Sequence, residues 1–199
     1  MEKRRENKLI IILSILLILF GIGTLLYSFK DDFKTKVKEK NALEEFYKNE
    51  ETEEIVNTTI EPDIKTDLYQ YVAVLKIPKI NLEKGIVGKN SIFNSVNYGI
   101  EMIGESDYPD VTNGDVILAA HNGSSSISFF RNLYKLERGD EAHLDYNYKT
   151  YKYKLVNIYD IEKNGKALIK SNKLKSNLIL VTCKGNTNYQ SIYIFELVK

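Results

Sequence analysis

The sequence predicts an all-β domain, a closed or nearly closed β-barrel, that follows an N-terminal transmembrane helix. Two features of the 199-residue chain predict the barrel: a composition rich in tyrosine, isoleucine and valine, and a series of short apolar or alternating runs after residue 68. Tyrosine and β-branched residues favour strands. With many short strands and few helices in about 130 residues, closing the sheet buries the strands without leaving exposed edges.

Residues 9–29 form an uncharged apolar run, LIIILSILLILFGIGTLLYSF, after a tail with four basic residues. As a helix that rises about 1.5 Å per residue, this run matches a hydrocarbon core of about 30 Å. A cleaved signal peptide has a shorter apolar region and an Ala-x-Ala-like site, and no such site follows Phe29. We therefore expect an uncleaved single-pass anchor in the cell membrane, with residues 1–8 in the cytoplasm and the rest of the chain outside.

Residues 30–67 are rich in charged and polar side chains, with apolar residues such as Phe33, Val37 and Leu43 at loosely helical spacing. This pattern indicates a partly helical stalk that lifts the following domain from the bilayer. A helix packed against the domain fits the same pattern equally well. The domain itself is expected to span residues 68–199.

The domain begins with alternating, β-branched residues at 68–88, which predict two short strands broken at Pro78. Short apolar runs predict buried strands at 114–120 and 178–182, and a last strand is expected at 191–198. Each of the two buried strands ends at a polar loop.

Between these strands, residues 143–161 are expected to form two strands with Asn147 near the turn. Residues 126–136, SISFFRNLYKL, place apolar side chains at helical intervals and predict a short helix. A turn at 137–140 is expected to use Gly139.

Two strand ends carry the residues best suited to nucleophilic chemistry. His121 follows the 114–120 strand, and Cys183, the single cysteine of the chain, follows the 178–182 strand. Strand ends that feed loops are where rigid scaffolds hold reactive groups, and a nearby imidazole activates a thiol. A buried, inert cysteine is the ordinary alternative. His143 falls within a strand and is expected to be a surface or structural residue.

Two other chemistries find less support. A metal site at His121 and Cys183 lacks a second cysteine and the paired ligand spacing of zinc sites. Ser124, Ser125 and Ser126 follow His121, but no Gly-x-Ser-x-Gly elbow is present. No metal site is therefore expected, and a net charge of +1 indicates no nucleic-acid partner.

Four segments are arranged in the order and spacing of a known family's motifs: LKIPKINLEKGIVG (75–88), AH (120–121), FFRNLYKLERGD (129–140) and LVTC (180–183). On these segments the domain resembles the sortase family over about residues 71–198. In the motif that contains Cys183, Ile179 stands where the family commonly has a threonine.

The resemblance implies an eight-stranded β-barrel that cleaves a sorting signal of the Leu-Pro-x-Thr-Gly kind. In such an enzyme Cys183 attacks the threonine carbonyl and forms a thioacyl intermediate. His121 protonates the leaving amine and later deprotonates the incoming one. The implied partners are the sorting signal of a surface protein and an amine from a peptidoglycan precursor or a pilin lysine. The short link between Cys183 and the last strand favours the housekeeping-like or class D-like types.

The chain departs from the family in one respect, because the arginine expected at the start of the last strand is missing. Setting the strand at residues 192–194 in register with the family puts Gln190 at the arginine position, with Ser191 as a one-residue alternative. Glutamine can donate N–H bonds to an oxyanion but brings no charge. Other basic residues are candidates for the missing charge, and nothing in the sequence ranks them: Lys184, Arg131 and Arg138.

No cofactor is expected. Some family members bind calcium in a loop near the acidic segment at 101–110, but the carboxylates here show no regular ligand spacing, so we expect a solvated loop. The missing arginine leaves a second function open: a catalytically weak sortase-like barrel that binds sorting-signal peptides or scaffolds pilus assembly. A third interpretation is an unrelated anchored β-domain with an inert Cys183.

Overall fold

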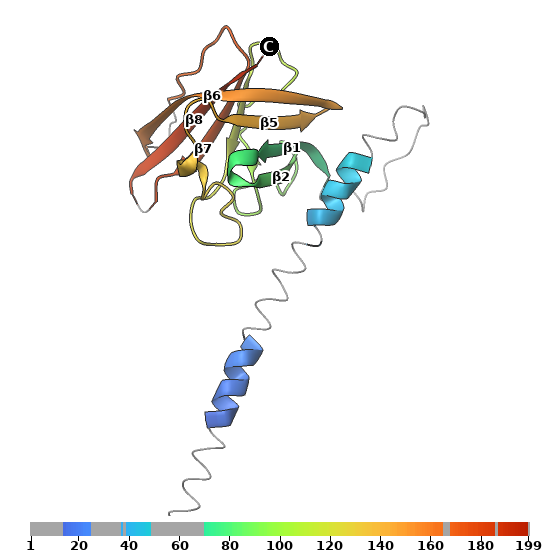
Figure 1. Cartoon of the computed structure of the whole chain (residues 1–199), viewed down its shortest axis with the longest axis vertical. Coiled ribbons are helices and arrows are strands. Elements are labelled where there is room, and N and C mark those ends of the chain that lie inside the picture. Colours follow the sequence, from blue (N-terminus) through green and yellow to red (C-terminus); the bar gives the residue numbers. More distant parts are fainter. Residues whose placement is uncertain are drawn as a thin grey trace, which may run out of the picture. The chain divides into compact units, whose positions relative to one another are not determined.

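The computed structural model shows two compact units, Met1–Asn41 and Ala42–Lys199 (Figure 1). The predicted tail, residues 1–8, lies outside the part of the chain that the structure describes. That part comprises residues 14–24, 37, 39–48, 70–164, 168–185 and 187–198.

Residues 14–24 are helical, and their large apolar side chains are exposed to solvent. They are the only described residues of the predicted span at 9–29. None of the helices in the described ranges combines the length and the apolar character that a bilayer crossing requires.

Of the predicted stalk at 30–67, the structure describes residues 37 and 39–48, which are helical. Tyr47 near the end of this helix donates a hydrogen bond to Glu83 at 3.0 Å. The Lys76 ammonium lies 4.9 Å from the centroid of the Tyr47 ring and 2.7 Å from a carboxylate oxygen of Asp145. These contacts lie within the second unit and join Tyr47 to residues of its sheet.

The second unit is built on one eight-stranded sheet, in the order β2-β1-β5-β6-β8-β7-β4-β3. Its edge strands, β2 and β3, contact each other, so the sheet is nearly closed, as the sequence predicts. The strands are β1 (Tyr71–Ile77), β2 (Leu82–Val87), β3 (Glu101–Met102), β4 (Asp115–Ala119), β5 (Glu141–Tyr146), β6 (Lys149–Glu162), β7 (Asn177–Cys183) and β8 (Tyr189–Leu197).

The turns lie where the sequence predicts breaks. A 3-10 turn η2 (Pro78–Ile80) separates β1 from β2, and Asn81 completes it with φ 50°. Between β5 and β6, Asn147 and Tyr148 have φ 52° and 62°. Two successive positive φ values are typical of the tight hairpin turns whose twist matches that of the paired strands.

The predicted short helix at 126–136 is wrong. The structure has successive turns there and only one 3-10 turn, η3 (Leu133–Lys135). The backbone bonds in this segment join residues three apart, as from Arg131 N to Ser128 O at 3.2 Å and from Leu133 N to Phe130 O at 3.2 Å. Apolar side chains spaced by three residues satisfy such turns as well as an α-helix, so the spacing alone does not separate the two.

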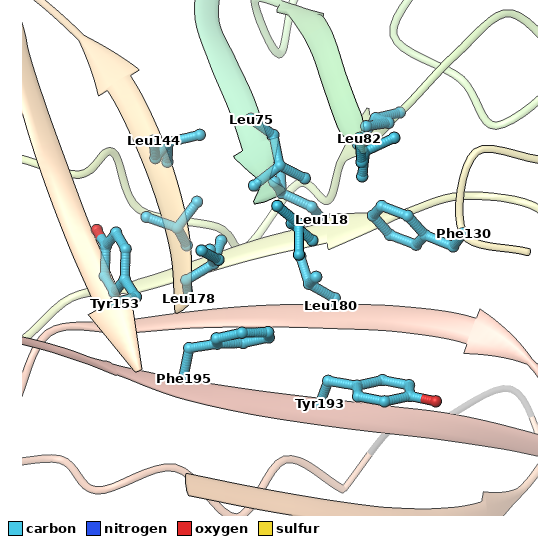
Figure 2. Close-up of a cluster of buried hydrophobic side chains, with 14 of the residues drawn as sticks. Leu75, Leu82, Leu118, Phe130, Leu144, Tyr153, Leu178, Leu180, Tyr193 and Phe195 are labelled. Carbon is cyan, nitrogen blue, oxygen red and sulfur yellow. The ribbon is translucent and has the colours of Figure 1, made fainter. Parts of the chain in front are cut away.

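Side chains alternate between two apolar clusters on the two faces of the sheet. Figure 2 shows Leu118 of β4, Leu180 of β7 and Phe195 of β8 together in the main core. The intervening residues form a smaller group on the opposite face, which we call the outer cluster: Ile117, Ile179, Ile192 and Ile194. Successive residues of a strand point to opposite faces, so these memberships identify the two faces of β4, β7 and β8.

Candidate active site

The parallel pairing of β4 with β7 brings the ends of the two strands that precede the predicted catalytic residues to the same end of the sheet. The register runs without a shift to Ala119 opposite Val181. Continuing it by two residues places His121 beside Cys183, at the same end of neighbouring strands. Paired strands lie about 4.8 Å apart. Both side chains are partly buried, so neither is sealed inside the core.

Hydrogen bonds hold the two strand ends together beyond the last ladder pair. Ala120 N donates to Val181 O at 3.3 Å, and Thr182 Oγ1 donates to Ala120 O at 2.8 Å. The carbonyl of His121 accepts a bond from Phe130 N at 3.1 Å, and Phe130 is fully buried in the main core. The backbone on both sides of the site is therefore fixed by the barrel.

The third strand of the site is β8, which places Gln190 directly opposite Cys183 and Ser191 opposite Thr182. By strand alternation Cys183 and Gln190 lie on the face of the outer cluster, and His121 continues the same alternation in β4. The face therefore carries a thiol, an imidazole and a side-chain amide at adjacent strand ends.

Ser191, the one-residue alternative to Gln190, lies on the other face. Its hydroxyl donates to Asp160 of β6 at 2.7 Å, and the same carboxylate accepts a hydrogen bond from Lys184. The bond from Lys184, together with that from Ser191, outweighs burial and holds the pKa of Asp160 below its ordinary value. The ammonium that follows Cys183 in sequence is thereby paired on the face away from Gln190.

The two arginines considered as replacements also have other partners. The Arg131 guanidinium donates to the carbonyl oxygens of Ser125 and Ser128, within the loop that follows His121. Arg138 donates to the side chain of Asn157 at 3.0 Å. The residue that the structure places directly opposite Cys183 is the neutral Gln190.

The remaining residues singled out in the sequence lie elsewhere. His143 is in the middle of β5, with its Nε2 3.4 Å from a carboxylate oxygen of Glu141. In the acidic segment 101–110, Glu101 and Asp107 accept backbone N–H bonds at 3.0 and 2.9 Å. Over the described ranges, no three His, Cys, Asp or Glu side chains are grouped so that they could hold a metal ion.

The connection between β6 and β7 covers part of the outer face. Ile169 packs against the outer cluster. The Tyr159 hydroxyl donates to Leu168 O at 3.0 Å and accepts from Lys170 N at 2.8 Å. A lysine-rich connection has no sequence pattern that predicts which face of the sheet it covers, so the contact with the outer cluster is not foreseen.

Asp115 at the start of β4 ties the same connection to the sheet. Its carboxylate accepts bonds from Ser171 and Asn177 at 2.8 Å each and pairs with the Lys173 ammonium at 2.5 Å. Burial acts to raise the pKa of Asp115, but the bonds from Lys173, Ser171 and Asn177 outweigh it and hold the pKa below its ordinary 3.8. This network could not be predicted from local patterns, because its members are 56 to 62 residues from Asp115 in the chain.

The positions of Cys183, His121 and Gln190 at the ends of their strands indicate what the site can do chemically. A partly exposed thiol next to an imidazole is the arrangement of a nucleophile with its acid–base partner. The side-chain amide of Gln190 can donate to an oxygen that develops negative charge near the sulfur. Acyl transfer is the reaction class that uses such a set.

The comparisons with known sequences point to one family. A family model described as a sortase domain matches residues 75–197. Among curated proteins, Sortase D of Bacillus subtilis (strain 168) is 32% identical over 119 residues, which are 60% of this chain and 57% of that protein. The chain therefore spans less than two thirds of the length of that relative.

Solved structures share the fold at low identity. A Sortase D5 transpeptidase from Clostridium perfringens has a TM-score of 0.61 and 23% identity, over 81% of this chain and 98% of that one. Sortase C2 of Pilus Island 1 from Group B Streptococcus has a TM-score of 0.59 and 18% identity, over 72% and 83%. The lid mutant of sortase A from Corynebacterium diphtheriae has a TM-score of 0.58 and 19% identity, over 65% and 70%.

The Asp115 network predicts an acid-sensitive stability. Because the folded state lowers the pKa of Asp115, its contribution is complete above about 3.8 and is lost as the pH falls through the lowered value. We expect Asp115→Asn to cost about 1–2 kcal/mol at pH 7 and to lose less stability than the wild type between pH 4 and about 2. Urea unfolding of the detergent-solubilised chain, followed by near-ultraviolet circular dichroism, measures both.

The matched control for this prediction is Asp110→Asn, because Asp110 is exposed. Its stability should equal that of the wild type at pH 7 and should fall in parallel with it between pH 4 and about 2. Equal acid sensitivity of wild type and Asp115→Asn would contradict the role given to this carboxylate.

Proposed function

The chain belongs to the sortase family, and from this premise we propose that it is a cysteine transpeptidase that cleaves an LPXTG-like sorting signal. The cleaved surface protein is then joined to a cell-wall or pilin amine through a thioacyl intermediate on Cys183. The observation that supports the proposal is the parallel β4–β7 register, which ends at Ala119 opposite Val181, two residues before His121 and Cys183 respectively. The family, whose members are typically cysteine transpeptidases, supplies the substrate class.

In the first half-reaction the Cys183 sulfur attacks the carbonyl carbon of the threonine in the sorting signal. The tetrahedral intermediate collapses with cleavage of the Thr–Gly bond, and His121 gives a proton to the leaving glycine amine. The products are a Cys183 thioester and a free C-terminal fragment. The Cys183 thiol proton passes to the His121 imidazole before the attack, so the sulfur attacks as a thiolate and the imidazolium carries the proton that the leaving amine receives.

In the second half-reaction the acceptor amine attacks the thioester carbonyl. His121 removes a proton from the incoming amine, and the Cys183 sulfur leaves as the thiolate. An amide bond replaces the thioester, so the surface protein is covalently attached. The same imidazole serves both directions, which requires that it stay next to the sulfur throughout.

Both half-reactions place negative charge on the threonine carbonyl oxygen. The side chain of Gln190, opposite Cys183, is within the part of the site where an N–H donor can meet this oxygen. A neutral amide stabilises it less than a guanidinium does, because charge-assisted bonds are about twice as strong as neutral ones. We therefore expect slower acylation than an arginine at this position gives.

The neutral side chain of Gln190, in place of an arginine, favours one alternative function. Lys184 is paired with Asp160, Arg131 is bonded to its own loop and Arg138 is bonded to Asn157, so each of the three basic candidates has another partner. The alternative is a barrel that binds sorting-signal peptides, or scaffolds pilus assembly, without efficient turnover. Such a barrel needs the surface that binds the peptide, but it does not need a cation to stabilise the oxyanion.

The location proposed for this activity is the outer face of the cell membrane. The helix at 14–24 exposes apolar residues all around, including Leu17, Phe20 and Ile22. A helix of a soluble protein has a polar face, and one that is apolar all round is buried in protein or lipid. Together with the uncharged run at 9–29, this supports a single-pass anchor that leaves the domain on the side where sorting signals and wall amines meet.

Peptide cleavage tests the proposed function. Detergent-solubilised wild type should cleave at least one fluorogenic peptide from a panel of LPXTG-like signals, and should form amide product when an amine is added. Cys183→Ala should abolish both, and His121→Ala should reduce turnover by about 10²–10⁴. Gln190→Arg should increase turnover if Gln190 stabilises the oxyanion.

His143→Ala is the matched control, since it removes the other histidine of the chain and should leave turnover unchanged. If wild type and Cys183→Ala behave alike across the panel, the enzyme is excluded. Peptide binding by both would then favour the alternative.

Cys183 also reports which side of the membrane holds the domain, because it is the only cysteine. We expect a membrane-impermeant maleimide added to intact cells to label the wild type but not Cys183→Ser. The protein should stay with the membrane after alkaline carbonate extraction. Labelling only after the cells are lysed, or release by carbonate, would contradict the proposed location.

A further inference from the structure

The residue after His121 contacts the other side of the site. The Asn122 side-chain Nδ2 donates a hydrogen bond to the backbone carbonyl of Cys183 at 2.9 Å. It does so beyond the last backbone bond between the two strands, from Ala120 N to Val181 O. The amide side chain thus extends the β4–β7 connection past the end of the ladder.

The bond works in the opposite direction to that of Thr182. Thr182 of β7 donates its hydroxyl to the carbonyl of Ala120, and Asn122 donates its amide to the carbonyl of Cys183. The two bonds therefore involve the residues immediately before and after His121, and the bond from Asn122 ends on the backbone of Cys183.

The bond also holds a backbone that is about to turn. After Cys183 the chain reverses, with Lys184 N donating to Tyr189 O at 2.9 Å and Gly185 at a positive φ of 51°. Cys183 is the last residue of β7 and pairs with Gln190 on the side of β8, whereas the ladder on the side of β4 ends at Ala119 opposite Val181. The Asn122 bond supplies a partner for the carbonyl at this position, and so restricts the rotation that carries the sulfur.

We infer that Asn122 is a positioning residue that holds the Cys183 sulfur in register with the His121 imidazole. The inference rests on the proposed function, in which the same imidazole exchanges protons with thiol and amine in both half-reactions. Side-chain chemistry fits the role: an asparagine amide donates to a carbonyl, whereas an aspartate at this position would place one acceptor against another.

The test is a cycle of substitutions at Asn122 and His121, with two readouts on the full chain in detergent. The first is the rate of Cys183 modification by a methanethiosulfonate reagent, which needs no substrate. The second is kcat and KM for the cleaved peptide. A group that acts through another shows no further effect once that other is removed.

We expect Asn122→Ala to slow both thiol modification and kcat by about five- to tenfold, the factor that one neutral hydrogen bond provides. KM should change little, because Asn122 acts on the thiol rather than on the peptide. In the His121→Ala background, Asn122→Ala should have no further effect on either rate. Asn122→Gln, which keeps the amide donor, should retain part of the rate.

The matched control is Asn132→Ala, which removes an asparagine from the same loop whose side chain makes no capping bond. It should leave both readouts unchanged. Equal melting temperatures of Asn122→Ala and wild type show that the effect is not a loss of fold. An equal fold-change from Asn122→Ala with and without His121 would overturn the inference.

The two readouts separate this inference from the proposed function. Coupling between Asn122 and His121 in thiol modification, with no peptide cleaved by the wild type, keeps the positioning role and excludes the transpeptidase. Peptide cleavage without coupling keeps the transpeptidase and excludes the positioning role. Absence of both overturns the two together.

Discussion

The site depends on the parallel hydrogen-bonded ladder between β4 and β7. All other neighbouring strands in this sheet are antiparallel, so this is the one place where two strands end side by side with chain directions alike. Parallel strands far apart in sequence bring their last residues to a common edge. Here His121 and Cys183 follow at that edge. Beyond the end of the ladder, the side chains of Thr182 and Asn122 donate hydrogen bonds from each strand to the backbone of the other. A displaced register would send one of the two side chains to the other face.

Strand alternation then sorts the charges around the site. Cys183 and Gln190 share the outer face, whereas the carboxylate of Asp160, with Lys184 and Ser191, lies on the opposite face. Lys184, the cation that follows Cys183 in sequence, is therefore engaged in an ion pair with Asp160, and the side chain opposite Cys183 is a neutral amide. Under the proposed function, an acid–base pair of His121 and Cys183 favours a transpeptidase, and a neutral Gln190 in place of a cation is expected to slow it.

Much of this structure could be predicted from local patterns. The apolar runs before His121 and Cys183 are short and continuously apolar, which predicts buried strands, and the last strand, expected at 191–198, is found as β8 at Tyr189–Leu197. The turns of residues 126–136 were missed because a three-residue apolar spacing suits both helix types. The bonds of Asn122 and Asp115 were missed for another reason. Each joins residues at least 56 positions apart, and polar side chains carry no mark of their distant partners.

Whether the imidazole and the sulfur are truly neighbours is tested most directly by a disulfide. The two Cα atoms of paired strands lie about 4.8 Å apart, within the range of about 4.4–6.8 Å that a disulfide spans. Under mild oxidation, His121→Cys should form an intramolecular bond with Cys183, with loss of two hydrogens in the intact mass and loss of both free thiols. His143→Cys, on β5, should not. A His121→Cys chain that keeps its thiols or pairs only between molecules, or a His143→Cys chain that pairs as readily, would contradict the β4–β7 register on which the site is built.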